Sequence, residues 1–114
     1  MAMLLKLLLA GAGGFIGAAS RYGLSLVIPS PWVTLGINVV GCLLIGFLHP
    51  LVKDREALLV FLIPGVLGGF TTFSAFGHET HELVRRGTPG LAALYVAASV
   101  GLGLGAVWLA RIRG

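Results

Sequence analysis

Four long apolar stretches restrict this chain to one class of structure. A helix needs about 20 apolar residues to cross the hydrocarbon core of a bilayer, and each stretch reaches that length. Hydrophobic residues make up 57% of the 114 residues and charged residues 11%, a balance typical of integral membrane proteins. The stretches cover residues 4–27, 32–52, 57–83 and 91–110. We therefore expect an all-α membrane protein with four transmembrane helices in a single domain, residues 1–114.

The connections between these stretches are short, and they read "PSP", "KDRE" and "RRGTPG". Lys6 followed by "LLLAGAGG" resembles the start of a secretory signal. The apolar character continues well past it, so we expect a retained span. Four thin spans cannot easily enclose a solvated path within one subunit. Any transport function therefore calls for an oligomer.

The distribution of positive charges only weakly predicts how the chain is oriented in the membrane. With four spans both termini lie on one side, and that side collects five cations against three on the other. The five are Lys6, Lys53, Arg55, Arg111 and Arg113, and the three are Arg21, Arg85 and Arg86. So small a difference lets the chain insert both ways, which permits an antiparallel homodimer. A single topology with cytoplasmic termini is the alternative, at about even odds.

Polar residues inside the spans mark where function should be sought, because an unsatisfied polar group in hydrocarbon costs several kcal/mol. Gly13 and Gly17 in the first span form a small-xxx-small face that predicts close helix packing. Arg21 follows, and it can snorkel, pair with carbonyls at a helix C-terminus or lend positive potential to an anion vestibule. We favour a structural role. Asn38 in the second span can bond a neighbouring helix or donate an N–H to an anion.

The third span contains "GVLGGFTTFSAFGHET", which predicts a helix break near 68–72. Pro64 has no backbone donor, the glycines at 65, 68 and 69 weaken a helix, and Thr71 and Thr72 are β-branched. A break exposes backbone carbonyls that can hold a cation, and N–H groups that can hold an anion together with Ser74.

Aromatic and hydroxyl residues extend this polar feature along two spans. Phe73 and Phe76 share a helix face if the helix resumes, and phenylalanine ring edges carry partial positive charge. Packing is the commoner role for such a pair, but the surrounding Gly, Thr and Ser residues favour a pair that lines an anion path. Tyr95 and Ser99 in the fourth span form a hydroxyl ladder, although such hydroxyls also bond their own helix.

Two other features carry no assigned role. "HETHE", residues 78–82, lacks the spacing of a zinc protease motif and fits a solvated helix end better than a metal site. The single Cys42 permits no intrachain disulfide and is interpreted as inert packing.

Three segments together resemble the Fluc (CrcB) family of fluoride channels. They are "GGFIGAASRY" at 13–22, "TLGINVVG" at 34–41 and "GGFTTFSAFGHE" at 68–79. The resemblance implies an antiparallel, dual-topology homodimer in the bacterial inner membrane, with two pores that export fluoride passively. It also implies a structural sodium ion at the dimer centre.

The resemblance further implies site residues. Backbone carbonyls of Gly68 and Thr71 of each subunit would hold the sodium ion. Arg21 would lie at the vestibule and Glu79 beyond the Phe pair. The pore would be lined by Asn38, Phe73, Ser74, Phe76, Tyr95 and Ser99. The chain departs from the family pattern at the next position of the polar track, where Gly103 replaces a hydroxyl residue.

Other function classes fit less well. Small multidrug antiporters have similar length and architecture, but proton coupling needs an acid embedded in the membrane. The first two spans contain no Asp or Glu. A purely structural assembly subunit remains an alternative that would pass no ions. An enzyme is least expected, because no nucleophile, base and orienting group converge in the sequence.

Overall fold

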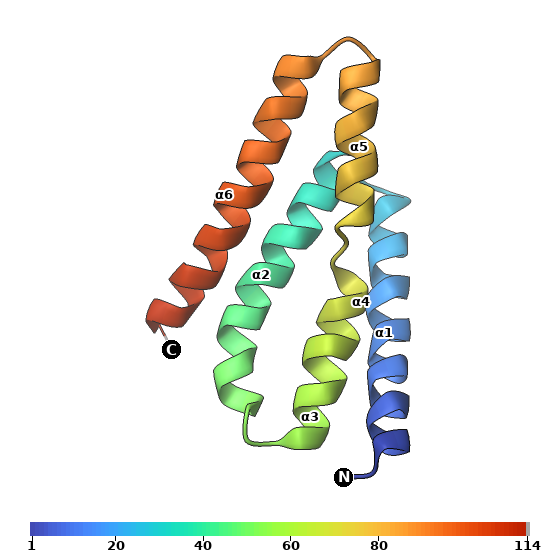
Figure 1. The fold of residues 1–114 in the computed structure, drawn as a ribbon, viewed down its shortest axis with the longest axis vertical. Coiled ribbons are helices and arrows are strands. Elements are labelled where there is room, and N and C mark those ends of the chain that lie inside the picture. The colour runs from blue at the N-terminus through green and yellow to red at the C-terminus, as the bar shows by residue number, and fades with distance from the viewer. Residues whose placement is uncertain (114) are drawn as a thin grey trace.

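A computed structural model describes residues 1–113, and these residues form helices joined by short turns, with no strand among them. Figure 1 shows the order of the elements along the chain. They are α1 (Met3–Ser25), α2 (Trp32–Val52), α3 (Glu56–Val60), the π-helical segment η1 (Phe61–Leu67), α4 (Gly68–Phe70), α5 (Ser74–Arg85) and α6 (Pro89–Arg113).

Four helical segments are long and apolar enough to cross a membrane. Three of them are the continuous helices α1, α2 and α6. The remaining one runs over Glu56–Arg85 and combines α3, η1, α4 and α5. The prediction of an all-α protein with four spans is therefore confirmed. The second span has the predicted limits, 32–52, and the limits of the other three differ from the prediction by one to three residues.

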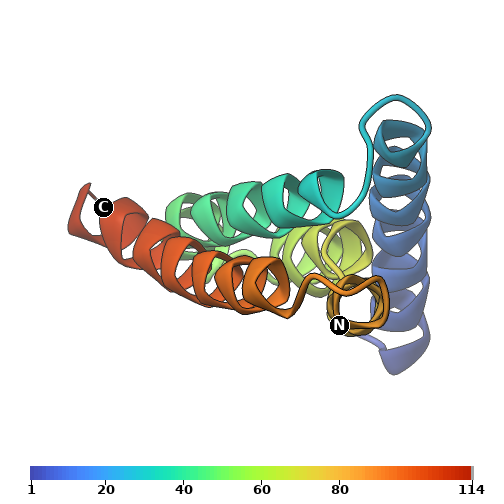
Figure 2. The same ribbon diagram turned by 90° about the horizontal axis from the view of Figure 1, so that it is seen from above.

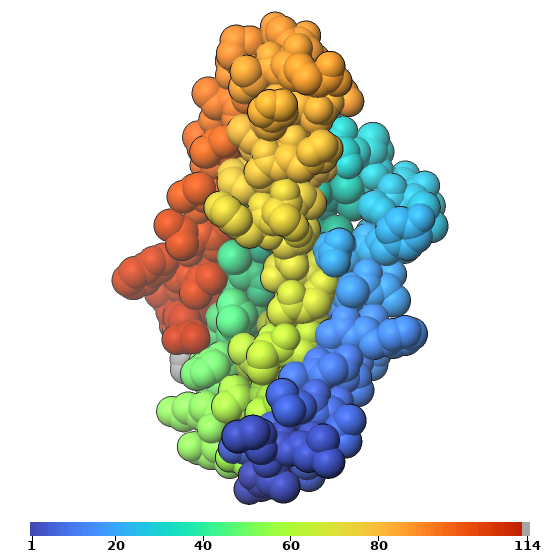
Figure 3. Space-filling model, turned by 45° about the vertical axis from the view of Figure 1, so that its right-hand side comes forward, coloured from blue at the N-terminus to red at the C-terminus, as the bar shows by residue number. Residues whose placement is uncertain are grey.

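The composite third span lies in the middle of the molecule. Figures 1 and 2 both place it between α1 on one side and the pair α2 and α6 on the other. In the space-filling view of Figure 3 it runs down the centre of the visible face, with α1 along its right-hand side. The described chain measures 51 × 30 × 22 Å, so its long axis exceeds the thickness of a bilayer core, about 30 Å.

Glycine contacts explain how close α1 comes to the third span. A Cβ added at Gly13 would lie 2.8 Å from the Val66 nitrogen, and one added at Gly17 would lie 2.6 Å from the Phe70 nitrogen. Real Cβ atoms essentially never come so near to backbone, so any larger residue would push the helices apart. The predicted small-xxx-small packing at Gly13 and Gly17 is confirmed.

In the N-terminal half of the third span, the segment η1 forms a π-helix that contains Pro64. Proline cannot donate the usual bond to the carbonyl four residues earlier, and a wider turn is a common local response. The Gly68 N–H accordingly bonds the Ile63 carbonyl, five residues back. The sequence predicted a weakened helix here, and the structure resolves it into a π segment followed by a separate break.

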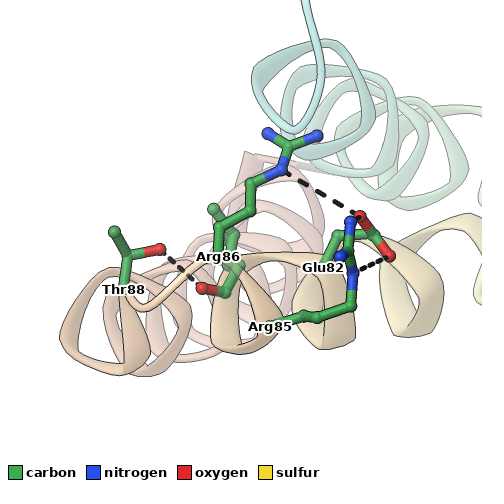
Figure 4. Close-up of polar contacts among 5 residues, drawn as sticks. Glu82, Arg85, Arg86 and Thr88 are labelled. Carbon is green, nitrogen blue, oxygen red and sulfur yellow. Dashed lines mark hydrogen bonds and ion pairs between the residues drawn. The ribbon is translucent and has the colours of Figure 1, made fainter.

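The C-terminal end of the third span contains ion pairs and is followed by a glycine. Glu82 pairs with Arg85 at 2.9 Å and approaches Arg86 at 4.0 Å, and the Thr88 hydroxyl donates to the Leu83 carbonyl at 2.6 Å (Figure 4). Gly87 then takes a φ of 85°, which glycine adopts without steric cost. The chain reverses there and α6 begins.

Candidate functional site

The third span is interrupted between α4 and α5. The helix ends at Phe70, Thr71 takes an extended conformation with φ −87° and ψ 158°, and helix resumes at Ser74. The predicted break near 68–72 is therefore present, but Gly68 and Gly69 are still helical and the interruption covers Thr71–Phe73.

The side chain of Asn38 on α2 bonds both backbone groups of Thr72, inside the interruption of the third span. Its Nδ2 donates to the Thr72 carbonyl at 2.9 Å, and its Oδ1 accepts the Thr72 N–H, also at 2.9 Å. A carboxamide carries both a donor and an acceptor, so one side chain satisfies both backbone groups of Thr72. Of the two uses expected for Asn38, the bond to a neighbouring segment is observed, and one N–H of its amide is left over.

The carbonyls of Gly68 and Thr71 are among those beside the break that do not receive the N–H bond that a continuous helix would provide. The Thr72 N–H, which would bond the Gly68 carbonyl, goes to Asn38 instead. The Ala75 N–H, which would bond the Thr71 carbonyl, goes to the Thr72 hydroxyl at 3.2 Å. The break thus frees the oxygens of Gly68 and Thr71.

Arg21 bonds a different carbonyl of the same segment. Its Nε donates to the Gly69 oxygen at 3.2 Å, from α1 across to the last turn of α4. Of the three uses expected for Arg21, pairing with a carbonyl at a helix C-terminus is the one observed. The guanidinium also borders a recess near the start of α2.

An open groove of about 580 Å³ runs along the break, between the third span and the pair α2 and α6. Its lining contains no charged side chain, and the two Phe rings in it lie 5.6 Å apart between centroids. Phe73 is 83% exposed in the single chain. The residues that line it are Asn38, Gly41, Cys42, Ile45, Ile63, Leu67, Gly68, Thr71, Thr72, Phe73, Phe76, Ser99 and Val100.

The groove brings together part of the predicted site. Asn38, Phe73, Phe76 and Ser99 line it, and so do both residues expected to hold a cation. Ser74 does not line it, and its hydroxyl instead lies 3.2 Å from the hydroxyl of Thr72. Cys42, interpreted from sequence as inert packing, is part of the lining.

The side chain of Cys42 also lies next to Gly103, one of the glycines of α6. A Cβ at Gly103 would lie 3.4 Å from the Cys42 sulfur. The thiol of α2 therefore occupies the position next to the missing side chain of α6. One turn away, the hydroxyl oxygen of Ser99 is buried and has no hydrogen-bond partner among the described residues.

A second, smaller recess of about 260 Å³ contains Arg21, Thr34 and Glu79. Thr34 donates to one carboxylate oxygen of Glu79 at 3.1 Å, and Tyr95 donates to the other at 3.4 Å. Tyr95 is 1% exposed and lies behind Phe76, at 5.3 Å between ring centroids. It therefore supports the groove from behind rather than lining it.

Sequence reasoning did not assign Glu79 and Thr34 to this cluster. Glu79 falls within "HETHE", interpreted as a solvated helix end, yet hydroxyls from α2 and α6 hold its carboxylate. Thr34 lies four residues before Asn38 and so faces the same side of α2. The four-residue spacing between Thr34 and Asn38 is therefore the sequence signal that could have identified Thr34.

The chain is similar to a large set of known proteins. A family described as "CrcB-like protein, Camphor Resistance (CrcB)" matches residues 8–111. A protein of Methylobacillus flagellatus is 40% identical over 91% of this chain and 90% of its own length. One of Rhizobium etli is 44% identical over 92% of both chains, and one of Novosphingobium aromaticivorans is 49% identical over 85% and 86%. All three are named "Fluoride-specific ion channel FluC".

Proposed function

Because the chain belongs to the CrcB-like family, we propose that it is a fluoride-selective channel that lets fluoride leave the cytoplasm passively. It is a multi-pass protein of the bacterial inner membrane, with four helices able to cross the bilayer. The observation that carries the proposal is the groove at the break, in which Asn38, Phe73 and Phe76 converge within the membrane-spanning part of the chain.

The lining of the groove suits a small anion that must shed water. Fluoride is strongly hydrated, so a path needs many weak donors that replace water without trapping the ion. The free N–H of Asn38 and the positive ring edges of Phe73 and Phe76 are donors of this kind. No lining residue carries a fixed charge, so none would bind the ion too tightly to release it.

The competing function classes are disfavoured on specific grounds. An antiporter needs an acid that exchanges protons, but no acid is among the residues that line the groove. Glu79 lies in the second recess, where two hydroxyls donate to its carboxylate. The relatives are named as ion channels, which confirms the prediction that the chain is not an enzyme.

The anion path requires a second copy of the chain, and we propose the antiparallel homodimer expected from sequence. Two features of the single chain support it. The groove is open along one side, and Phe73 is 83% exposed. A second copy would cover both. Tags on each terminus should be reached by a membrane-impermeant reagent from both sides of the membrane in comparable amounts, and labelling from one side only would contradict the antiparallel arrangement.

A structural sodium ion is part of the same proposal. The carbonyls of Gly68 and Thr71, freed at the break, are the kind of oxygen ligand that hard cations prefer. Two copies related by a two-fold axis would contribute four such oxygens. Bound there, the ion would supply positive charge that ties the two breaks together. Replacing sodium with N-methylglucamine should lower the temperature at which the dimer dissociates, and an unchanged temperature would argue against the ion.

The role of the aromatic pair can be tested in vesicles. Phe76→Ile removes the ring while keeping an apolar side chain, so we expect fluoride efflux to fall by at least tenfold with the dimer intact on gel filtration. Phe61→Ile, an aromatic change on the same span outside the groove lining, serves as the matched control. Wild-type efflux in Phe76→Ile would remove this residue from the path.

A further inference from the structure

The helices α2 and α6 pack tightly at Gly46, far along the chain from the break. A Cβ at this glycine would lie 3.0 Å from the Val107 carbonyl, and the facing Ala110 is 0% exposed. The two helices run side by side in Figure 1 and form one wall of the groove, to which α2 contributes Asn38 and Cys42 and α6 contributes Ser99.

Pro50 interrupts the hydrogen-bond ladder of α2 beside this tight contact. It lies inside the helix, one turn after Gly46. A proline has no N–H, so the carbonyl four residues before it loses its partner in the helical ladder. That carbonyl belongs to Gly46. In a membrane-spanning helix such a group needs a donor from elsewhere, because no water is at hand.

Arg111 on α6 provides the donor. Its Nε donates to the Gly46 carbonyl at 3.2 Å, across 65 positions of sequence. The bond therefore joins the defect in α2 to the last turns of α6. At the opposite end of the same helix pair, Tyr95 and Thr34 are joined through Glu79. The pair is thus held by polar bonds at both ends, on either side of the groove.

We propose that Arg111 is a positioning residue that replaces the hydrogen bond Pro50 removes, and that it thereby holds α6 in register against α2 along the groove wall. Its effect on transport rests on the proposed channel function, while its effect on the helix pair does not. Arg111 acts here through its bond to a carbonyl, not as one more cation at the membrane surface.

A double-mutant cycle separates these two roles. Arg111→Met removes the donor, and Pro50→Ala restores a backbone N–H for Gly46. If Arg111 serves the orphaned carbonyl, its loss should matter only while Pro50 is present. If it serves as a charge, its loss should matter equally in both backgrounds. Lys53→Met, which removes an exposed cation just after α2, is the matched control for charge.

The native Cys42 reports on the helix pair without any added label. It is the only cysteine of the chain, its sulfur lies beside Gly103 of α6, and it lines the groove whose wall this helix pair forms. The probe is methyl methanethiosulfonate, applied to the purified dimer in detergent, so the readout does not depend on fluoride transport. A thermal melt of each variant and fluoride efflux from vesicles complete the set.

We expect Arg111→Met to speed Cys42 modification by about tenfold, the factor that corresponds to losing one hydrogen bond from a charged donor, and to lower the melting temperature. Lys53→Met should match wild type, Pro50→Ala should match it in Cys42 modification and equal or exceed it in melting temperature, and Pro50→Ala with Arg111→Met should match Pro50→Ala alone. If Arg111→Met fails to assemble, rescue by Pro50→Ala supports the same conclusion.

The proposal is overturned if Arg111→Met changes neither readout, if its effect or its failure to assemble persists in the Pro50→Ala background, or if Lys53→Met has the same effect. A channel that proves inactive in vesicles, with the coupling intact, would count against the proposed function alone.

Discussion

At the scale of single residues, Asn38 determines the geometry of the break. A carboxylate could only accept the Thr72 N–H, and an ammonium could only donate to the Thr72 carbonyl, but a carboxamide does both from one side chain. Both bonds measure 2.9 Å. They divert the Thr72 N–H from the helix and so leave the Gly68 oxygen free. One residue of α2 thus links the interruption of the third span to the proposed cation site.

Asn38→Asp tests this role with almost no change in shape. The carboxylate can accept the Thr72 N–H but cannot donate to the Thr72 carbonyl, which is left unpaired, and it places a negative charge in the groove. We expect the dimer to lose about 1–3 kcal/mol of stability and fluoride efflux to fall sharply. Cys42→Ser, a polar change in the same groove, should stay close to wild type in a denaturation series. Equal stability of Asn38→Asp and wild type would contradict the proposed bond pattern.

The pairing of Asn38 with Thr72 could not be predicted from sequence. The spacing of polar residues identified Asn38 as important and left two uses open. Its partner lies 34 positions away on another span, and no local pattern connects them. For the same reason Glu79 was assigned to a solvated helix end, although its bonding partners come from α2 and α6.

At the scale of elements, the third span owes its shape to its glycines and to Pro64. Gly65 and Gly69 let α1 pack against its backbone, and a Cβ at Gly69 would lie 2.9 Å from the Gly14 Cα. Local chemistry predicted both the weakness of this helix and the flat face of α1. It did not predict the π turn, or that the interruption would cover 71–73, because Gly68 and Gly69 remain helical against α1.

Gly17→Ala tests the contact between α1 and the third span. Its new Cβ would lie 2.6 Å from the Phe70 nitrogen, so α1 must shift away from the turn that precedes the break. Overpacking of this kind costs about 1–3 kcal/mol or more, and we expect a lower melting temperature. Gly11→Ala, on the same helix where a Cβ meets nothing within 4 Å, should be neutral or slightly stabilising. Equal melting of the two variants would refute the packing argument.

At the scale of the whole molecule, four helices make a thin body that does not enclose a path. The groove lies open at one side of the chain, and Phe73 is 83% exposed there. The number and length of the spans were predictable because the thickness of a bilayer dictates them. The groove was not, because it forms where three spans meet and depends on which helices become neighbours.

The central claim is that this chain conducts fluoride and excludes larger anions. The most direct test is efflux from proteoliposomes loaded with fluoride or with chloride, in sodium buffer, with valinomycin to balance charge and ion electrodes as readout. We predict rapid release of fluoride and little release of chloride. A folded dimer that releases neither ion, or that releases both at similar rates, would contradict the account.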